Sequence, residues 1–428
     1  MKIIGKLKNK YNNIIAKKNS SLEYSNLYYY ALNGILYTIG IQLYKSYANK
    51  FIYRLGGNEF HIALYTALPG FIAVFTTLPG IIFMSKIKNK KQSITRSFYC
   101  SRFFLLLFAL VPFLPNEYRA ITFVLLISLM NFPESVSTAA LQSYVGDIFE
   151  EETISTALTT RNSYSTFVQI IISLMLGQFM KLISIKFSDN FTIIAYQLLF
   201  ILAFIVGLKE ISALKKLKEI REEKQKKINI RSSLSGLKKE KKYIIFIVCS
   251  LIFHFGWQMG WPLFSIYQIQ YLGADELWLS ITNMSSSIVM VISYMFWNKT
   301  IVRKGNGFVM AYCSLGMAIT PLLFVISPNL LILTVVFSVS GFFTSGTVTV
   351  ILNSLLEVAP EKNRAFFVAF HVTLTNITLC ISPLVGNYIL AHKGIIFALI
   401  MVSILRVIGS ITFFIRNKFF YVKNVKEA

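Results

Sequence analysis

Apolar runs long enough to cross a bilayer recur along the whole chain, and they constrain its fold more than any other feature. A transmembrane helix needs about 20 mostly apolar residues, because each residue advances the helix by only about 1.5 Å. Of the 428 residues, 55% are hydrophobic and only 14% are charged, whereas about 25% of the residues in a soluble domain are charged. The sequence therefore predicts an all-α, polytopic membrane protein.

Twelve such runs are predicted to be transmembrane helices. They cover residues 26–49, 61–84, 98–115, 119–143, 162–184, 191–208, 243–264, 279–298, 308–327, 330–353, 365–390 and 395–415. Six runs come before a strongly basic segment and six follow it. This division predicts an N-terminal six-helix bundle with a basic tail (1–208), a basic linker (209–242) and a C-terminal six-helix bundle (243–428).

The lysines and arginines are distributed unevenly over the predicted loops. Of the 43, 34 fall on the side that holds both termini and the linker, six fall on the other side, and Lys45, Arg102 and Arg406 fall within apolar runs. Cytoplasmic loops are the ones enriched in such residues, so both termini are predicted to be cytoplasmic. The net charge of +24 is therefore explained by the membrane topology of the chain, and it does not indicate nucleic-acid binding.

The linker is too polar to enter lipid, and it is expected to lie in solvent or on anionic headgroups. The frequent Lys, Ile and Asn residues favour a bacterial source, so the predicted location is the bacterial plasma membrane.

The two predicted bundles share an internal repeat. When the sequence is shifted by 209 residues, Asn162, Thr166, Gln169, Ser173 and Gly177 fall on His371, Thr375, Thr378, Ser382 and Gly386. Their spacing of three and four residues puts each set on one face of a helix. A duplicated six-helix unit is an architecture known among transporters.

Two stretches resemble the major facilitator superfamily, and the resemblance covers almost the whole chain. Residues 355–390, LLEVAPEKNRAFFVAFHVTLTNITLCISPLVGNYIL, are similar to the family's stretch from the end of helix 10 through helix 11. The basic loop from Gly80 to Lys91 resembles the family's loop between helices 2 and 3, although its acidic residue is absent. The resemblance implies two pseudo-symmetric six-helix bundles, a central cavity lined mainly by helices 1, 4, 7 and 10, and alternating access.

The chain departs from the pattern of drug/proton antiporters in this family. The fourth predicted helix has no arginine within its membrane part, and the fifth lacks the usual Gly-Pro pair. The resemblance therefore does not favour a standard multidrug antiporter, but it leaves both directions of transport, uptake and efflux, open.

Glu134 is predicted to be the only acidic residue well inside a helix, next to Pro133. An ionisable group at that depth is costly to bury and is a functional candidate by default. Asn131, Glu134 and Thr138 share one helical face, which we expect to turn toward the cavity. Glu134 is the candidate for proton coupling. The alternatives are a static ion pair with Arg102 or Lys45, or a protonated carboxyl in a hydrogen bond.

Polar and aromatic residues on the four expected cavity helices are candidates for substrate contact, because such groups suit a neutral or amphipathic organic solute. They are Asn33, Tyr37, Gln42, Lys45, Asn131, Thr138, His254, Trp257, Gln258, Trp261, Ser345 and Thr349. The alternative for His254 is a satisfied interhelical histidine, and the aromatic residues could serve in packing or at the membrane interface.

Each half also has a basic loop after its second helix and an acidic patch after its fourth. We expect ion pairs between them that hold the cytoplasmic side closed. The candidate gate residues are Lys86, Lys88, Asp147, Glu150, Arg303, Lys304, Glu357 and Glu361. Exposed pairs are each worth about 0–1 kcal/mol, so a network is needed.

The combined prediction is a monomeric secondary transporter for a small organic solute, coupled to protons. No Walker-type phosphate loop, metal-ligand spacing or catalytic arrangement is readable, so the sequence predicts no cofactor, no metal and no enzymatic activity. The alternatives are an uncoupled facilitator and a non-transporting membrane sensor or receptor on the same scaffold.

Overall fold

The computed structural model describes residues 21–84, 89–220, 240–360 and 364–426, and these residues are almost entirely helical. The helices are α2 (Ser21–Lys45), α3 (Ala48–Arg54), α4 (Glu59–Met84), α5 (Lys90–Leu110), α6 (Asn116–Ile148), α7 (Glu151–Lys186), α8 (Asp189–Lys215), α10 (Lys241–Ile266), α11 (Glu276–Val325), α12 (Leu330–Val358) and α13 (Arg364–Lys426). A short 3-10 helix (Val111–Phe113) follows α5, and a π-helix (Tyr267–Tyr271) follows α10.

Within the described residues, nine helical segments are long and apolar enough to cross a membrane. Helix α2 is not among them, and the two longest helices, α11 and α13, count once each. Both of these contain a non-helical glycine at which two helices meet: Gly305 (φ 80°, ψ 163°) and Gly394 (φ 82°, ψ 169°). A residue with a Cβ rarely adopts this backbone conformation, so a glycine is needed at each turn.

Several helix starts follow from local side-chain chemistry. Asn89, Asp275 and Asn329 each accept a hydrogen bond from a backbone N–H in the first turn of α5, α11 and α12, respectively. Such bonds satisfy donors that have no partner within the helix. The first predicted span, 26–49, is interrupted at residues 46–47, so it forms α2 and the beginning of α3.

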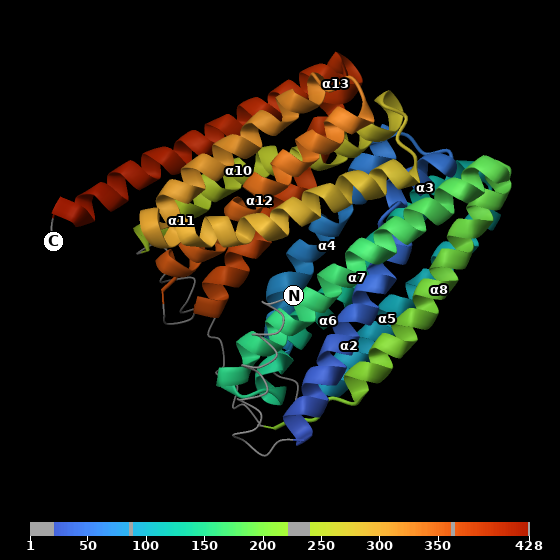
Figure 1. The fold of residues 1–428 in the computed structure, drawn as a ribbon, viewed down its shortest axis with the longest axis horizontal. Coiled ribbons are helices and arrows are strands. Elements are labelled where there is room, and N and C mark those ends of the chain that lie inside the picture. The colour runs from blue at the N-terminus through green and yellow to red at the C-terminus, as the bar shows by residue number, and fades with distance from the viewer. Residues whose placement is uncertain (1–20, 85–88, 221–239, 361–363, 427–428) are drawn as a thin grey trace.

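The helices form two groups, which Figure 1 shows as a blue-to-green set (α2–α8) and a yellow-to-red set (α10–α13). Two close helix crossings join them. Gly70 of α4 lies against Asn376 and Leu379 of α13, and Gly177 of α7 lies against Leu277 and Ser280 of α11. The absence of a side chain at each glycine lets the facing helix approach closely.

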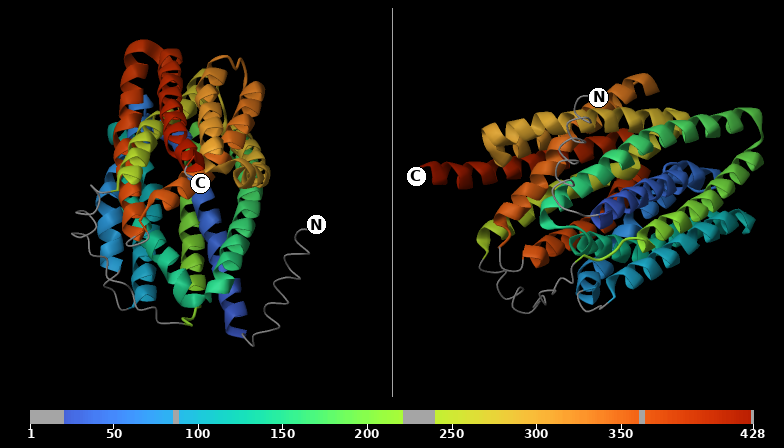
Figure 2. Two further views of the ribbon diagram at one scale, coloured as in Figure 1. Left: turned by 90° about the vertical axis from the view of Figure 1, so that its left-hand side faces the viewer. Right: turned by 60° about the horizontal axis from the view of Figure 1, so that its bottom comes forward.

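The two groups meet near α3 and diverge toward the ends at which α2 and α10 begin (Figure 1). Figure 2 shows that most helices of both groups run roughly along one direction. Near α3, a buried aromatic cluster of Phe51, Phe108, Phe123, Tyr196 and Phe200 fills the interior of the first group. The first group is therefore densely packed at the end where it touches the second.

Candidate functional site

Glu134 lies in a buried polar cluster inside the first helix group. Its carboxylate accepts a hydrogen bond from Arg102 on α5 at 2.8 Å and another from the hydroxyl of Ser101. Arg102 and Glu134 are 3% and 9% exposed. Of the alternatives that the sequence left open, the ion pair between Glu134 and Arg102 is present in this conformation.

A second carboxylate completes the cluster. Glu210 of α8 is 1% exposed and accepts from the Nε of Arg102 at 3.0 Å, with its Oε2 2.9 Å from an Nη2 nitrogen. The expectation that Glu134 is the only acidic residue well inside a helix is therefore wrong, because Glu210 is buried within α8. The apolar run seemed to end at 208 because the polar sequence KEIS follows, but α8 continues to Lys215 and turns Glu210 inward.

The two glutamates and Arg102 together carry a formal charge of −1, and Lys45 and Arg161 interact electrostatically with Glu134 and Glu210, respectively. Burying an unpaired charge costs several kcal/mol, so each carboxylate depends on Arg102. Aromatic rings flank the guanidinium: its carbon lies 5.3 Å from the ring centroid of Phe98 and 5.6 Å from that of Tyr37. On α8, a Cβ at Gly207 would lie 2.5 Å from the Arg102 side chain, so this glycine makes the room that the arginine occupies.

The other polar residues predicted on α6 make local bonds. The Asn131 amide donates to the carbonyl of Ile127, and the Thr138 hydroxyl donates to that of Glu134. The helix continues through Pro133, although proline cannot donate the usual backbone hydrogen bond. Of the three residues predicted to share one face of this helix, Glu134 is thus the one whose side chain bonds to another helix.

The candidates on α2 have different neighbours. Asn33 is buried and donates to the backbone carbonyl of Glu210, so it joins α2 to α8. Tyr37 contacts Arg102 as described above. Gln42 accepts from Ser46 on the next turn. The side chain of Lys45 is exposed in the structure, yet it interacts electrostatically with Glu134.

The candidates on α10 lie close to α13. The Gln258 amide donates to the carbonyl of Thr375 at 3.1 Å and accepts from the Thr378 hydroxyl at 2.6 Å. His254 bonds to the carbonyl and hydroxyl of Ser250, whose hydroxyl also contacts His371. His254 is therefore hydrogen-bonded to its own helix, α10, whereas the alternative interpretation was a hydrogen bond between helices.

The remaining cavity candidates lie on α10 and α12. The rings of Trp257 and Trp261 meet edge to face, and Trp261 is 41% exposed. Ser345 and Thr349 donate to carbonyls of their own helix. Arg406, which no sequence argument explained, donates to the carbonyls of Gly256, Trp257 and Met317, so it binds two neighbouring helices of its group.

The end at which the two groups meet holds a polar network that the sequence did not reveal. Arg54 at the end of α3 donates to Glu276 at 3.0 Å and to Asp189 at 2.9 Å, and Tyr196 donates to Glu276. The Lys50 ammonium donates to the carbonyl of Ala274. These bonds join the two groups, and Glu276 is fully buried among them.

The gate candidates are only partly within the described residues: Lys86, Lys88 and Glu361 lie outside them. Asp147 pairs with Lys90 at 2.7 Å, which joins the basic and acidic segments of the first half. In the second half, Asn306 donates to Glu357. Glu150 directly precedes α7, and its backbone carbonyl accepts a hydrogen bond from the N–H of Thr153. Arg303 and Lys304 line a pocket on the second helix group.

Known proteins resemble this chain in part of its sequence and in its fold. The model of the Major Facilitator Superfamily matches residues 246–427. The C-terminal part of the chain, residues 246–427, is therefore similar in sequence to the major facilitator superfamily. Among solved structures, the nucleoside transporter NupG, in a mutant form, is 15% identical with a TM-score of 0.70, and the match covers 92% of this chain and 100% of NupG.

A D-xylose-proton symporter and the xylose transporter XylE from E. coli, in a partially occluded inward-open conformation, are each 13% identical. Their TM-scores are 0.67 and 0.65, and each match covers 92% of this chain and 97% of the other. At this identity the likeness shows the fold alone. No curated protein sequence matches the chain significantly.

The superfamily model covers the second helix group, whereas the likeness to solved structures spans both groups and concerns the fold alone. The Glu134 cluster lies in the first group, outside the residues that the superfamily model matches. Its role is therefore argued from its own contacts.

Proposed function

We propose that this chain is a transporter of the major facilitator superfamily, which moves a small organic solute across the membrane by alternating access. The observation that carries the proposal is the one-sided contact between the helix groups: the Arg54–Glu276 network joins them at one end, and they diverge toward the other. A molecule closed at one end can release or admit solute at the other, and rocking of the groups would exchange the two states.

We further propose twelve membrane crossings in two bundles, 1–208 and 243–428, joined by the linker 209–242. Counting α2 as a span and dividing α11 and α13 at Gly305 and Gly394 gives this number. The charge asymmetry of the loops supports cytoplasmic termini in a bacterial inner membrane, which puts the Arg54 network on the outer side. The chain would act as a monomer, with its linker near anionic headgroups.

The Glu134 cluster supports proton coupling. Two carboxylates share one guanidinium, so binding of one proton would remove the net negative charge without breaking both ion pairs. Glu134 is more exposed than Glu210 and interacts with Lys45 on α2, an expected cavity helix. Glu134 is thus the carboxylate that solvent reaches more readily. Its protonation would change its electrostatic interaction with Lys45, and therefore the interactions of α2, the helix that would contact the substrate.

Transport in proteoliposomes tests both statements. A panel of sugars, nucleosides, amino acids and peptides is offered to the reconstituted chain, with and without a proton gradient. Uptake that the gradient accelerates is the expected result for a coupled transporter. An uptake rate that is the same with and without the proton gradient would indicate a facilitator. Binding of a solute without any uptake would indicate a receptor.

Glu134→Gln then tests the site. We expect this variant to keep exchange of substrate across the membrane while losing acceleration by the proton gradient, because the amide cannot take up a proton. The matched variant Glu210→Gln removes the less exposed carboxylate. Unaltered coupling in Glu134→Gln would remove Glu134 from the mechanism.

A further inference from the structure

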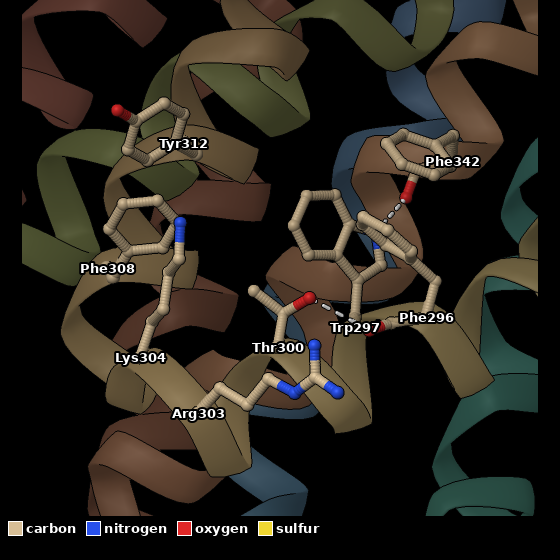
Figure 3. A pocket seen from close by; sticks show the side chains of 8 residues that line it. All are labelled: Phe296, Trp297, Thr300, Arg303, Lys304, Phe308, Tyr312 and Phe342. Carbon is tan, nitrogen blue, oxygen red and sulfur yellow. Dashed lines mark hydrogen bonds between the residues drawn. The ribbon is translucent and has the colours of Figure 1, made fainter.

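A pocket of about 320 Å³ lies on the second helix group, between the two parts of α11 and helix α12 (Figure 3). Aromatic side chains form most of its wall: Phe296, Trp297, Phe308, Tyr312 and Phe342. The indole N–H of Trp297 donates to the carbonyl of Phe342 at 2.7 Å, which fixes this ring in the wall. The pocket is formed entirely by α11 and α12, whereas the Glu134 cluster lies on α5, α6 and α8.

Two cations line the pocket. Arg303 and Lys304 are both exposed, and the Lys304 ammonium lies 4.4 Å from the centroid of the Phe308 ring. Figure 3 shows the Arg303 guanidinium near Thr300, whereas the Lys304 side chain extends toward Phe308. The ion pairs that the structure shows among the described residues include neither cation.

From the pocket, an exposed apolar surface continues along both parts of α11. Ile292 lies one turn before Phe296, and Leu315 and Ile319 follow Tyr312 by three and seven residues, so each lies on the same helical face as its pocket residue. These side chains are 66%, 45% and 48% exposed. In a membrane-spanning helix, such a surface is covered by lipid acyl chains.

We propose that this pocket binds an anionic phospholipid. Its phosphate pairs with Arg303 and Lys304, and an acyl chain passes Phe296 and Tyr312 and continues over Ile292 and Ile319. Paired cations beside a pocket between transmembrane helices on the cytoplasmic side are the chemistry that binds anionic headgroups. A free phosphate ion would leave the aromatic wall without a partner, which favours the lipid.

The leaflet rests on the proposed orientation, in which Arg303 and Lys304 face the cytoplasmic leaflet that carries the anionic lipids. The binding itself does not depend on transport, so failure of one proposal leaves the other standing. The site also differs from the linker, whose expected contact with headgroups needs no pocket.

Quenching of tryptophan fluorescence tests the site on the full chain. The protein is reconstituted in phosphatidylcholine nanodiscs that contain a small fraction of brominated phosphatidylglycerol or, in parallel, of brominated phosphatidylcholine. The Trp297 signal is isolated as the difference from Trp297→Phe. We expect brominated phosphatidylglycerol to quench Trp297 at a mole fraction about tenfold lower than brominated phosphatidylcholine, since each cation near an anionic lipid contributes appreciable affinity.

Two variants separate the charges from the groove. Arg303→Gln with Lys304→Gln is expected to abolish the preference for the anionic lipid. Thr300→Phe keeps both cations and fills the pocket, so it is expected to reduce quenching by both brominated lipids. The matched control is Lys299→Gln with Lys418→Gln, which removes two exposed cations outside the pocket and is expected to keep the preference.

Three results would overturn the proposal: equal quenching by the two brominated lipids, a preference that survives loss of Arg303 and Lys304, and displacement of the brominated lipid by millimolar inorganic phosphate. The last of these would assign the cations to a soluble anion.

Discussion

The Arg54 guanidinium donates a hydrogen bond of 3.0 Å to the Glu276 carboxylate, and this contact joins α3 of the first helix group to the start of α11 in the second. The Arg54 side chain is 15% exposed and that of Glu276 is fully buried. The same arginine pairs with Asp189, whose side chain is 90% exposed. One cation thus makes a buried bond between the groups and an exposed bond within its own group.

Glu276→Gln is expected to open the Arg54 end of the molecule. Breaking a buried ion pair costs about 3–5 kcal/mol, so the population with this end closed should fall by at least about tenfold. The measurement is the rate at which a membrane-impermeant maleimide, applied from that side, labels Ser280→Cys in a chain without its four native cysteines. Ser280 suits this because it is buried in the same contact, 2.6 Å from the Tyr47 hydroxyl.

Asp189→Asn is the matched control, because it removes an exposed partner of the same arginine. Exposed pairs are worth about 0–1 kcal/mol, so the labelling rate should change little. Equal rates in both variants would show that Glu276 does not hold the groups together.

Arg102→Gln is expected to destabilise the first helix group strongly, by about 3–5 kcal/mol, because it leaves the buried Glu134 and Glu210 without the cation that is hydrogen-bonded to both. The yield of monodisperse protein and its thermal unfolding in detergent measure the effect. Adding Glu210→Gln to this variant removes one uncompensated charge and should restore part of the loss. Failure of the second change to restore anything would mean that the two carboxylates do not share Arg102.

Gly207→Ala tests whether α8 packs so closely against the Arg102 side chain that only a glycine fits at this position. The new Cβ would lie 2.5 Å from that side chain, and such overpacking costs about 1–3 kcal/mol. Gly40→Ala is the control, since a Cβ at Gly40 meets nothing within 4 Å and alanine favours the helix. The thermal unfolding temperature of Gly207→Ala should be lower than that of the parent, and that of Gly40→Ala should be equal to or higher than that of the parent. The reverse order would contradict the close approach of α8 to Arg102.

Gly305→Ala is expected to cost about 1–3 kcal/mol, because φ near 80° with ψ near 163° is accessible essentially only to glycine. A Cβ at this position meets nothing within 4 Å, so the effect would report backbone strain alone. A thermal unfolding temperature equal to that of the parent would show that α11 can pass this point as a continuous helix.

Local sequence patterns predicted the helical class and the approximate spans, and they singled out Glu134 as a candidate, because hydropathy and charge within one stretch determine what a bilayer accepts. They failed where a residue's role depends on another helix. Glu210 lies just past the end of an apolar run, and only the packing of α8 against α5 shows that it is buried beside Arg102. Arg406 likewise has no local explanation, since its acceptors are carbonyls of residues 149, 150 and 89 positions away.

The division between sequence and structure has a physical basis. The sequence by itself determined that this chain partitions into a membrane as a series of helices, since transfer of apolar side chains and backbone hydrogen bonding act within each segment. The tertiary structure alone decided which charges neutralise each other and which end of the molecule is closed. Those outcomes depend on contacts such as Arg54–Glu276, whose partners are 222 residues apart in the chain and 3.0 Å apart in space.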